Sequence, residues 1–288
     1  AGLKGWMADF GEALPWDAVL YSGVDPKKYH NQYPVDWARV NREAIEEANQ
    51  LGEIAFFSRS SFTGGSRYST FYWAGDQMTS WQKNDGLRSI VPALISSGIC
   101  GMSVNHADVG GFAGFWKVGG LFQMRRRRKL LKRHIELGAF SPVFRTHEGI
   151  IPAKNVQIYS DPDIRSFYIE LSQLRQQLIP YLKKTAAEAY LKGFPMARHL
   201  YLHYPNDKNA QKVKDQFLLG DALLIAPKLK KTGSKRRLYL PQGQWQHLFT
   251  QKRYIGHQYI NIKAPLGQPP VFVKCLENRP LIELNTNK

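Results

Sequence analysis

The chain has 288 residues, 43% of them hydrophobic and 22% charged, and its formal net charge is +17 at pH 7. This is ordinary globular composition, and the length suits one large domain or one domain with a smaller partner. No apolar run approaches the ~18 residues of a membrane-spanning helix. The two cysteines, Cys100 and Cys275, show no metal-ligand spacing and are expected to be buried free thiols rather than a disulfide.

Short apolar runs alternate with helical patterns up to about residue 192. Asp85 is the expected N-cap of the second helix, Pro92 could kink that helix, and Pro180 could break the last one. This repetition of strand, loop and helix predicts a parallel α/β architecture. Strands are predicted over 4–9, 53–60, 70–76, 100–108 and 140–148, and helices over 34–52, 85–98, 124–137 and 161–193.

Each predicted strand ends in a polar or charged residue: Asp9, Arg59, Asp76, Asp108 and His147. In a (β/α)8 barrel the active site lies at the C-terminal edge of the strands and draws residues from several of them. A doubly wound sheet would instead concentrate its ligand groups at one switch point. Successive strands that each deliver a polar group therefore favour the barrel.

The pattern changes after about residue 195. Short β runs broken by Pro, Gly and Asn follow, which predicts a β-sandwich. We expect residues 1–194 to form a catalytic barrel domain and residues 195–288 to form the sandwich. About five barrel strands fit before residue 195, whereas a complete barrel needs eight. We therefore expect residues 1–194 to be the C-terminal part of a barrel, about strands 4 to 8, in a fragment of a longer protein.

Two basic runs, at 124–133 and 228–237, supply much of the positive charge. A basic excess can indicate nucleic-acid, membrane or anionic-substrate binding. The first run continues into Leu130, Leu131 and Ile135, which predicts the exposed side of an amphipathic helix, and the second predicts a hairpin loop. No aromatic stacking platform is interleaved with either run, so solvated surfaces are favoured and no nucleic-acid partner is expected.

Two carboxylates stand out as candidate catalytic groups. Asp9 follows Trp6 closely, and Asp76 follows Trp73. Paired carboxylates in an aromatic cleft suit glycoside hydrolysis, in which one attacks the anomeric carbon and the other donates a proton to the leaving oxygen. Two acidic residues at strand ends could equally bind Mg²⁺ or cap helices, and their spacing alone does not decide between these roles.

Four strings, in this order, resemble the catalytic barrel of glycoside hydrolase family 31: GWMADFGEALP, YWAGDQ, HADVGGF and RTHEG. The forms MADFGE, WAGDQ and RTHEG are most similar to its sulfoquinovosidase branch, the α-glycosidases that release 6-sulfo-6-deoxyglucose. The resemblance continues through DQFLLGDALLIAP and APLGQPPVF in the β region. It implies a retaining α-glycosidase for small or oligosaccharide α-glucoside-type substrates, with α-sulfoquinovosides among them, and no cofactor or metal.

By this resemblance Asp9 is the nucleophile and Asp76 is the general acid and then the general base, with their carboxyl groups ~5–5.5 Å apart. Arg59 is expected to hold sugar hydroxyls, or else to form a structural salt bridge. His147 is expected to hydrogen-bond the 2- or 3-hydroxyl, or else to be a core residue. The remaining site positions are Trp73 as an apolar wall, Asp108 as a residue that orients Arg59 or a loop, Glu12 as a loop-fixing carboxylate, and Gln77 and Phe112 as substrate-binding residues.

Departures from the branch concern the sulfonate. After the D-[IV]-G-G motif the branch has a Tyr that helps to read the sulfonate, and this chain has Phe112, which lacks the hydroxyl. One lost polar contact can change the substrate. Segment 113–123 is longer than the branch's loop and contains Lys117, which could bind an anion or be a solvated lysine. The branch's other sulfonate-reading residues, an Arg and a Trp, lie upstream of the nucleophile strand.

Two other hypotheses stay open. The chain could be an inactive fragment that serves as a binding or structural element, because the first barrel strands are missing. It could also be a basic nucleic-acid-binding protein, because its net charge is +17. No N-x-[ST] acceptor occurs, which together with the cysteine pattern favours a cytoplasmic protein over a glycosylated, secreted one. The oligomeric state is not predicted.

Overall fold

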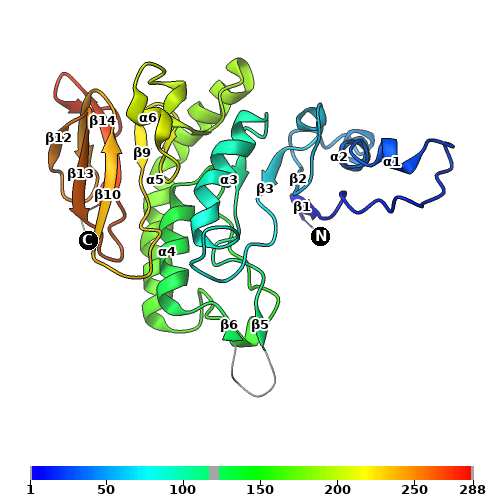
Figure 1. Ribbon diagram of the computed structural model, residues 1–288, viewed down its shortest axis with the longest axis horizontal. Coiled ribbons are helices and arrows are strands. Elements are labelled where there is room, and N and C mark those ends of the chain that lie inside the picture. The colour runs from blue at the N-terminus through cyan, green and yellow to red at the C-terminus, as the bar shows by residue number, and fades with distance from the viewer. Residues whose placement is uncertain (1, 117–122, 287–288) are drawn as a thin grey trace. The chain divides into compact units, whose positions relative to one another are not determined.

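The structure is a computed structural model that describes residues 2–116 and 123–286. The chain divides into two compact units, Ala1–Gly75 and Asp76–Lys288 (Figure 1). Each unit has its own secondary structure and is described by itself. The elements of the first unit are β1 (Gly5–Ala8), α1 (Pro26–Tyr29), α2 (Tyr33–Glu47), β2 (Ala55–Ser58), the 3-10 helix η1 (Gly65–Arg67) and β3 (Phe71–Trp73).

In the first unit β1, β2 and β3 pair in parallel. Ala8 is the register partner of Ser58, and Ser58 is the register partner of Tyr72. Because parallel strands end at the same edge of a sheet, Asp9 and Arg59 emerge next to each other, each directly after its strand. The predicted strands 4–9, 53–60 and 70–76 are confirmed in this region, although each is shorter than expected.

Helix α2 lies between β1 and β2 in the chain and ends at Glu47, short of the predicted stop. Its Ala38 and Ile45 join Ala8 and Phe56 in a small core of buried side chains. All four are less than 4% exposed. The first unit is therefore a parallel α/β arrangement, as the alternating pattern of the sequence predicts.

The second unit contains three main helices followed by a β-rich region. Helices α4 and α5 pack together, with the Lys132 ammonium 4.8 Å from the Phe167 ring centroid. The elements are α3 (Leu87–Ile99), β4 (Asn105–His106), β5 (Phe115–Trp116), β6 (Gln123–Met124), α4 (Arg128–Ala139), η2 (Pro152–Lys154), α5 (Pro162–Lys192), β7 (Ala197–Arg198), η3 (Leu200–Leu202), α6 (Lys208–Lys212), β8 (Phe217–Leu219), β9 (Leu223–Ile225), β10 (Lys235–Leu240), β11 (Gln244–His247), β12 (Arg253–Ile255), β13 (Gln258–Lys263), β14 (Val271–Leu276) and β15 (Arg279–Pro280).

Helix α5 is one continuous helix of 31 residues. The Asp161 side chain caps its first turn by accepting the N–H of Ile164 at 3.1 Å, and Gly193, in the left-handed conformation at φ 73°, ends it. Pro180 lies inside the helix without ending it. No helix among residues 2–116 and 123–286 is long and apolar enough to cross a membrane.

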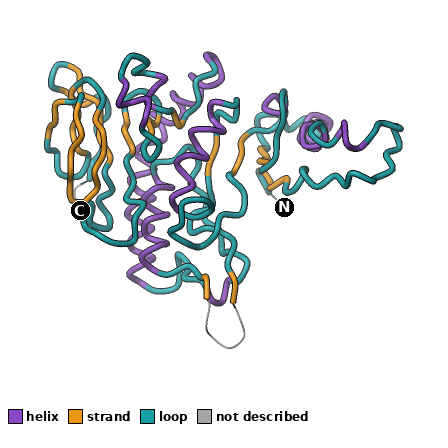
Figure 2. Tube along the Cα trace, in the orientation of Figure 1, coloured by secondary structure: helices purple, strands orange, loops and turns teal. Residues whose placement is uncertain are grey.

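The strands after α5 form antiparallel sheets, which Figure 2 shows in orange. One sheet has seven strands in the order β12–β11–β14–β9–β8–β7, with β15 on β14, and the other pairs β10 with β13. Their shared core includes Leu218, Leu224, Trp245 and Phe272, all fully buried. The β-rich character that the sequence predicts for this region is present.

The predicted strand 140–148 is wrong. Within the part of the chain that the structure describes, residues 140–148 form no strand, and Thr146 makes an isolated bridge to Val109. Pro142 has no N–H to give to a ladder, and Arg175 takes up the nearby carbonyl groups instead, with Nη2 donating to Pro142 O at 2.6 Å. In this segment, N–H groups of the Arg175 side chain therefore donate to backbone carbonyl groups that would face a neighbouring strand in a sheet.

Two smaller predictions also fail. Asp85 is not the N-cap of α3, because the helix begins at Leu87 and its N-cap is Gly86, which has no side chain to cap it. Cys100 is exposed rather than buried, and Cys275 is buried as expected. Both errors arise at helix ends, where the sequence pattern defines boundaries least well.

Candidate active site

Asp9 lies just beyond β1 at the C-terminal edge of the parallel strands. Its side chain is 37% exposed, and its Oδ1 accepts the N–H of Phe10 at 2.7 Å and lies 3.3 Å from Arg59 Nη1. Phe10 adopts φ 62°, a left-handed conformation that non-glycine residues seldom adopt. This bend turns the chain sharply after β1 and leaves the carboxylate accessible, which a nucleophile requires.

Arg59 joins Asp9 to Glu12. Its Nε donates to Glu12 Oε1 at 2.8 Å, its Nη2 is 2.6 Å from the same oxygen, and its guanidinium lies 4.6 Å from the Phe10 ring centroid. Ser60 Oγ donates to Phe10 O at 2.7 Å. Glu12 and Ser60 therefore hold the loop and the guanidinium in place, which supports the loop-fixing role predicted for Glu12.

Trp73 ends β3 and is only 3% exposed. Its indole packs edge-on against Phe57, with ring centroids 5.4 Å apart. Its Nε1 is buried and has no hydrogen-bond partner among the described residues. The ring exposes almost no surface to solvent, and its predicted role as an apolar wall stays a prediction.

Asp76 and Gln77 open the second unit. Asp76 is exposed and Gln77 is buried. The Gln77 carbonyl accepts the N–H groups of Phe112 at 2.8 Å and Ala113 at 2.9 Å. These bonds join the YWAGDQ motif to the HADVGGF motif, so the backbone of Gln77 fixes the loop whatever its side chain contacts.

Asp108 is paired with an arginine that the motif analysis did not single out. Its carboxylate accepts from Arg145 Nη2, and Arg145 Nε donates to His106 Nε2 at 2.8 Å. Asp108 is 1% exposed. Burial raises the pKa of Asp108, Arg145 and His147 oppose that rise, and Asp76 adds to it. Asp108 is thus bound to the arginine of the RTHEG segment, and its role of orienting Arg59 or a loop stays a prediction.

His147 and Phe112 are in contact. Their rings meet edge-to-face with centroids 5.0 Å apart, and His147 Nδ1 accepts the N–H of Gly149 at 2.9 Å. That bond leaves Nε2 as the nitrogen that could meet a sugar hydroxyl. His147 and Glu148 also line a cavity of about 130 Å³, which is below the size of typical small-molecule sites.

Arg126 is a site-building residue that sequence reasoning missed. It belongs to the basic run 124–133, yet it is 1% exposed. Its guanidinium donates to the carbonyl groups of Gly111 at 3.3 Å, His147 at 2.6 Å and Glu148 at 3.1 Å. Burial lowers the pKa of Arg126 to about 10. Its hydrogen bonds link the HADVGGF and RTHEG motifs to each other.

The expectation of a solvated basic helix is therefore wrong for part of the run. Arg133, 5% exposed, also points inward, where its Nη2 donates to Ala264 O at 2.6 Å and its Nη1 contacts Glu136 at 2.6 Å. Helical periodicity could not reveal this for Arg126, because α4 begins only at Arg128 and Arg126 precedes the helix. Buried backbone carbonyl groups need hydrogen-bond donors, and the arginines that point inward are those that reach such groups.

The predicted residues thus form two groups. Asp9 and Arg59 meet in the first unit, while Asp108, Phe112 and His147 lie on connected loops of the second. The predicted spacing of Asp9 and Asp76 stays a prediction. Lys117 lies outside the described residues. No cluster of His, Cys, Asp or Glu able to hold a metal ion occurs in 2–116 or 123–286.

Comparison with known families matches both parts of the chain. Residues 1–185 match the glycosyl hydrolases family 31 TIM-barrel domain, and residues 193–275 match the glycosyl hydrolase family 31 C-terminal domain. The chain is 41% identical over 274 residues to a sulfoquinovosidase of Escherichia coli K12, and 41% identical over 275 residues to a sulfoquinovosidase of Agrobacterium fabrum. Each alignment covers 95% of this chain.

A solved structure shares this fold. It is a family 31 sulfoquinovosidase from E. rectale in complex with an aza-sugar inhibitor, with a TM-score of 0.89 and 38% identity over 96% of this chain. The matched region covers 39% and 40% of the two curated relatives and 40% of the solved chain, so this chain spans about two fifths of their length. The family matches extend over most of the sequence, and the chain belongs to glycoside hydrolase family 31.

Proposed function

We propose that this chain carries the catalytic carboxylates of a retaining α-glycoside hydrolase. The observation that carries the proposal is Asp9: it is accessible, lies at the C-terminal end of a parallel strand, and is held 3.3 Å from Arg59. Catalytic residues of barrel enzymes occupy that position. The relatives in the same family, which are named as sulfoquinovosidases, support the reaction class.

In the proposed mechanism Asp9 attacks the anomeric carbon as Asp76 donates a proton to the departing glycosidic oxygen. The C–O bond to the aglycone breaks and a bond from the Asp9 carboxylate forms. Asp76, now ionised, takes a proton from water, which attacks the same carbon and releases Asp9. Two displacements on one carbon retain its configuration. Arg59 would hold the nucleophile and a sugar hydroxyl, and His147 Nε2 would bind the 2- or 3-hydroxyl.

We propose the matching architecture as well. Residues 1–194 would form the C-terminal part of a (β/α)8 barrel, about strands 4 to 8, and residues 195–288 a β-sandwich. The parallel pairing of β1, β2 and β3 supports the first assignment. The two antiparallel sheets after α5 support the second. Trp73, Gln77, Asp108 and Phe112 would complete the substrate site.

The proposed substrates are α-glucoside-type glycosides, with an α-sulfoquinovoside as the first member to test. The named activity of the relatives favours the sulfonated sugar. Phe112 argues against a full sulfonate contact, because its ring faces His147 and has no hydroxyl. A site built for a polar contact discriminates strongly against loss of that contact.

The test uses the full-length protein that contains this chain and an aryl α-glycoside. Asp9→Asn should lower kcat/KM by more than ~1,000-fold, because it removes the nucleophile. Asp17→Asn, an exposed aspartate in the same segment, is the matched control and should leave turnover unchanged. Normal turnover by Asp9→Asn would sink the mechanism.

Azide separates the two carboxylate roles. In Asp9→Gly, azide can attack from the vacated side, and a single displacement should yield the β-glycosyl azide. In Asp76→Gly, azide should intercept the glycosyl-enzyme and yield the α-glycosyl azide. Product configuration is read by NMR. The same configuration from both variants would contradict the assignment.

A substrate panel addresses the glycone. Aryl α-glucoside, α-xyloside, α-galactoside and α-sulfoquinovoside are compared for the native protein and for Phe112→Tyr. We expect the tyrosine hydroxyl to raise kcat/KM for the α-sulfoquinovoside by about tenfold and to leave the α-glucoside nearly unchanged. An equal change for both substrates would exclude Phe112 as a sulfonate-reading position.

A further inference from the structure

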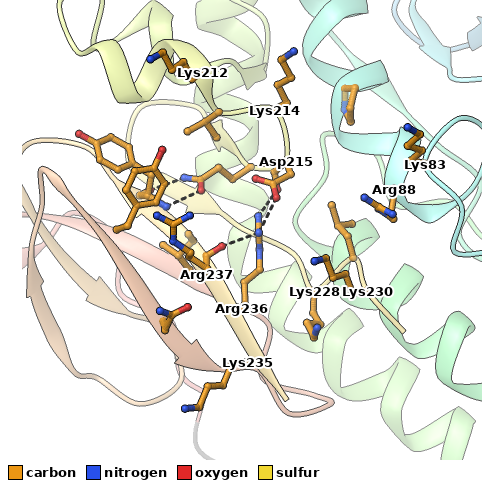
Figure 3. Close-up of a pocket in the computed structure, with 18 residues that line it drawn as sticks. Lys83, Arg88, Lys212, Lys214, Asp215, Lys228, Lys230, Lys235, Arg236 and Arg237 are labelled. Atoms are coloured by element: carbon orange, nitrogen blue, oxygen red, sulfur yellow. Dashed lines mark hydrogen bonds and ion pairs between the residues drawn. The ribbon is translucent and has the colours of Figure 1, made fainter. Parts of the chain in front are cut away.

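A basic cavity of about 770 Å³ lies in the second unit and takes no part in the proposed chemistry. Figure 3 shows its charged side chains coming from three places in the chain. Lys83 lies in the loop before α3 and Arg88 in its first turn. Lys212 and Lys214 come from the end of α6 and just beyond it, and the third set comes from the 228–237 run that leads into β10. We call this cavity the basic groove. The third set comprises Lys228, Lys230, Lys235, Arg236 and Arg237.

The charge of the basic groove is strongly one-sided. Nine lysine and arginine side chains line it, with one carboxylate, Asp215, so the lining carries a net charge of +8. Asp215 is already engaged, because Arg236 Nη1 donates to its Oδ2 at 2.7 Å and Arg236 Nη2 donates to its backbone carbonyl at 2.8 Å. The carboxylate therefore neutralises one cation and leaves the rest without a counter-charge on the groove wall.

Two of the cations are held in unfavourable surroundings. Lys228 is 5% exposed, and its Nζ donates to Thr232 O at 2.9 Å. Burial lowers the pKa of Lys228, and the nearby cations Arg133 and Arg236 lower it further. The Nε of Arg236 is buried and has no hydrogen-bond partner among the described residues. An anion in the groove would relieve the repulsion and supply acceptors.

The dimensions favour a ligand with several anionic groups. A volume of about 770 Å³ falls within the range of ligand sites that enclose a molecule larger than a single inorganic anion. Six of the nine cations are lysines, and all of these except the buried Lys228 can act as point charges that do not demand one planar geometry. They suit sulfate or carboxylate groups spaced along a flexible chain.

The aromatic residues argue against a nucleic acid. Single-stranded nucleic acids bind where bases can stack on open rings. The two tyrosines that line the groove do not form a row of open rings: Tyr239 is fully buried, and Arg237 lies 4.3 Å from the ring centroid of Tyr259, which is 42% exposed. We propose that the basic groove binds an anionic oligosaccharide through its sulfate or carboxylate groups. This inference holds whether or not the chain hydrolyses glycosides.

The test measures binding of a heparin-derived octasaccharide to the full-length protein by calorimetry at low and high salt. Lys214→Glu combined with Lys230→Glu reverses two exposed charges of the groove lining. Lys183→Glu combined with Lys184→Glu makes the same change of net charge at exposed positions on α5, outside the groove. Circular dichroism checks that each variant is folded.

We expect the octasaccharide to bind at low salt and to bind more weakly as salt screens the charges. The groove variant should lose affinity by about tenfold or more, and the α5 variant should lose less than about threefold. Absence of binding at low salt, or equal losses in the two variants, would overturn the site. Tighter groove-dependent binding of a single-stranded DNA of equal charge would overturn the glycan assignment.

Discussion

Two aspartate–arginine pairs of this chain use the same chemical groups in opposite surroundings. Asp9 and Arg59 form a pair in the first unit, where the Asp9 side chain is 37% exposed. Asp108 and Arg145 form a pair in the second unit, where the Asp108 side chain is 1% exposed. Arg59 also binds Glu12, and Arg145 also donates to His106. The two aspartates, each paired with an arginine, therefore differ most in solvent access.

Asp9 is an accessible carboxylate, whereas Asp108 is a buried carboxylate that links parts of the structure. A carboxylate that must form and break a bond needs an open approach, which Asp9 has and Asp108 lacks. A buried carboxylate has no water to stabilise its charge, so it depends on its cation. Asp9 can lose Arg59 and remain hydrated, whereas Asp108 without Arg145 would be a buried, unpaired charge. Three predictions test this distinction, beginning with the largest effect.

Arg145→Met should lower the free energy of unfolding by about 3–5 kcal/mol at pH 7, because it strips a buried carboxylate of its partner. Burial already raises the pKa of Asp108, and removal of the cation would raise it further. The folded variant would then hold a proton that the unfolded chain releases. Its stability should therefore fall as pH rises above the unfolded value of the carboxyl, and the deficit should be smaller near pH 4.

Chemical denaturation at pH 4 and pH 7 measures this effect. The double variant Arg145→Met with Asp108→Asn is the control, because it removes both charges and should recover part of the lost stability. If Arg145→Met lowers the free energy of unfolding by less than ~1 kcal/mol, the buried pair behaves like an exposed one and the distinction between the two pairs is wrong.

A buried histidine behind the second pair should make the protein acid-sensitive. Burial lowers the pKa of His134 to about 3, and its Nε2 has no hydrogen-bond partner among the described residues. As the pH falls below about 6.5, His134 binds a proton in the unfolded chain but stays neutral in the folded chain until the pH nears 3. Stability should therefore be complete above pH 6.5 and fall by about 1.4 kcal/mol per pH unit between 6.5 and 3 from this group.

Thermal unfolding between pH 7 and pH 4 follows this loss. His134→Gln should flatten the pH dependence, because glutamine does not titrate, even if it lowers the overall stability. His257→Gln changes a histidine whose side chain is 69% exposed and should leave the slope as it was. An unchanged slope in His134→Gln would assign the acid sensitivity to other groups.

Arg59→Met should have the smallest effect on folding. The pair is partly hydrated, so the free energy of unfolding should change by less than ~1 kcal/mol. Catalysis should respond instead, with a loss of about 100-fold in kcat/KM if Arg59 holds both Asp9 and a sugar hydroxyl. Denaturation and steady-state kinetics on the full-length protein measure the two effects. Arg42→Met, which breaks the α2 surface pair with Glu46, should leave the kinetics unchanged.

The positions of individual side chains were predictable where a motif and a strand coincide. Asp9 and Arg59 follow short apolar runs, and parallel pairing makes them neighbours. Arg126 could not be predicted in the same way. It stands among like residues in sequence, and only the carbonyl groups of His147 and Glu148 distinguish it. Residues 140–148 could not be predicted either: their pattern predicts a strand, but carbonyl groups in this segment accept hydrogen bonds from the Arg175 side chain.

Motifs and local patterns along the chain were enough to predict the family and the alternation of strands and helices, because both depend on residues close together in sequence. Which charges are buried could be seen only in the folded chain. Asp9 and Asp108 are the same residue in similar motifs, and only the surrounding chain excludes water from one of them. The tertiary structure also buries Arg126 and brings lysines that are far apart in sequence into the basic groove. Solvent access depends on contacts between residues far apart in sequence, which no local pattern encodes.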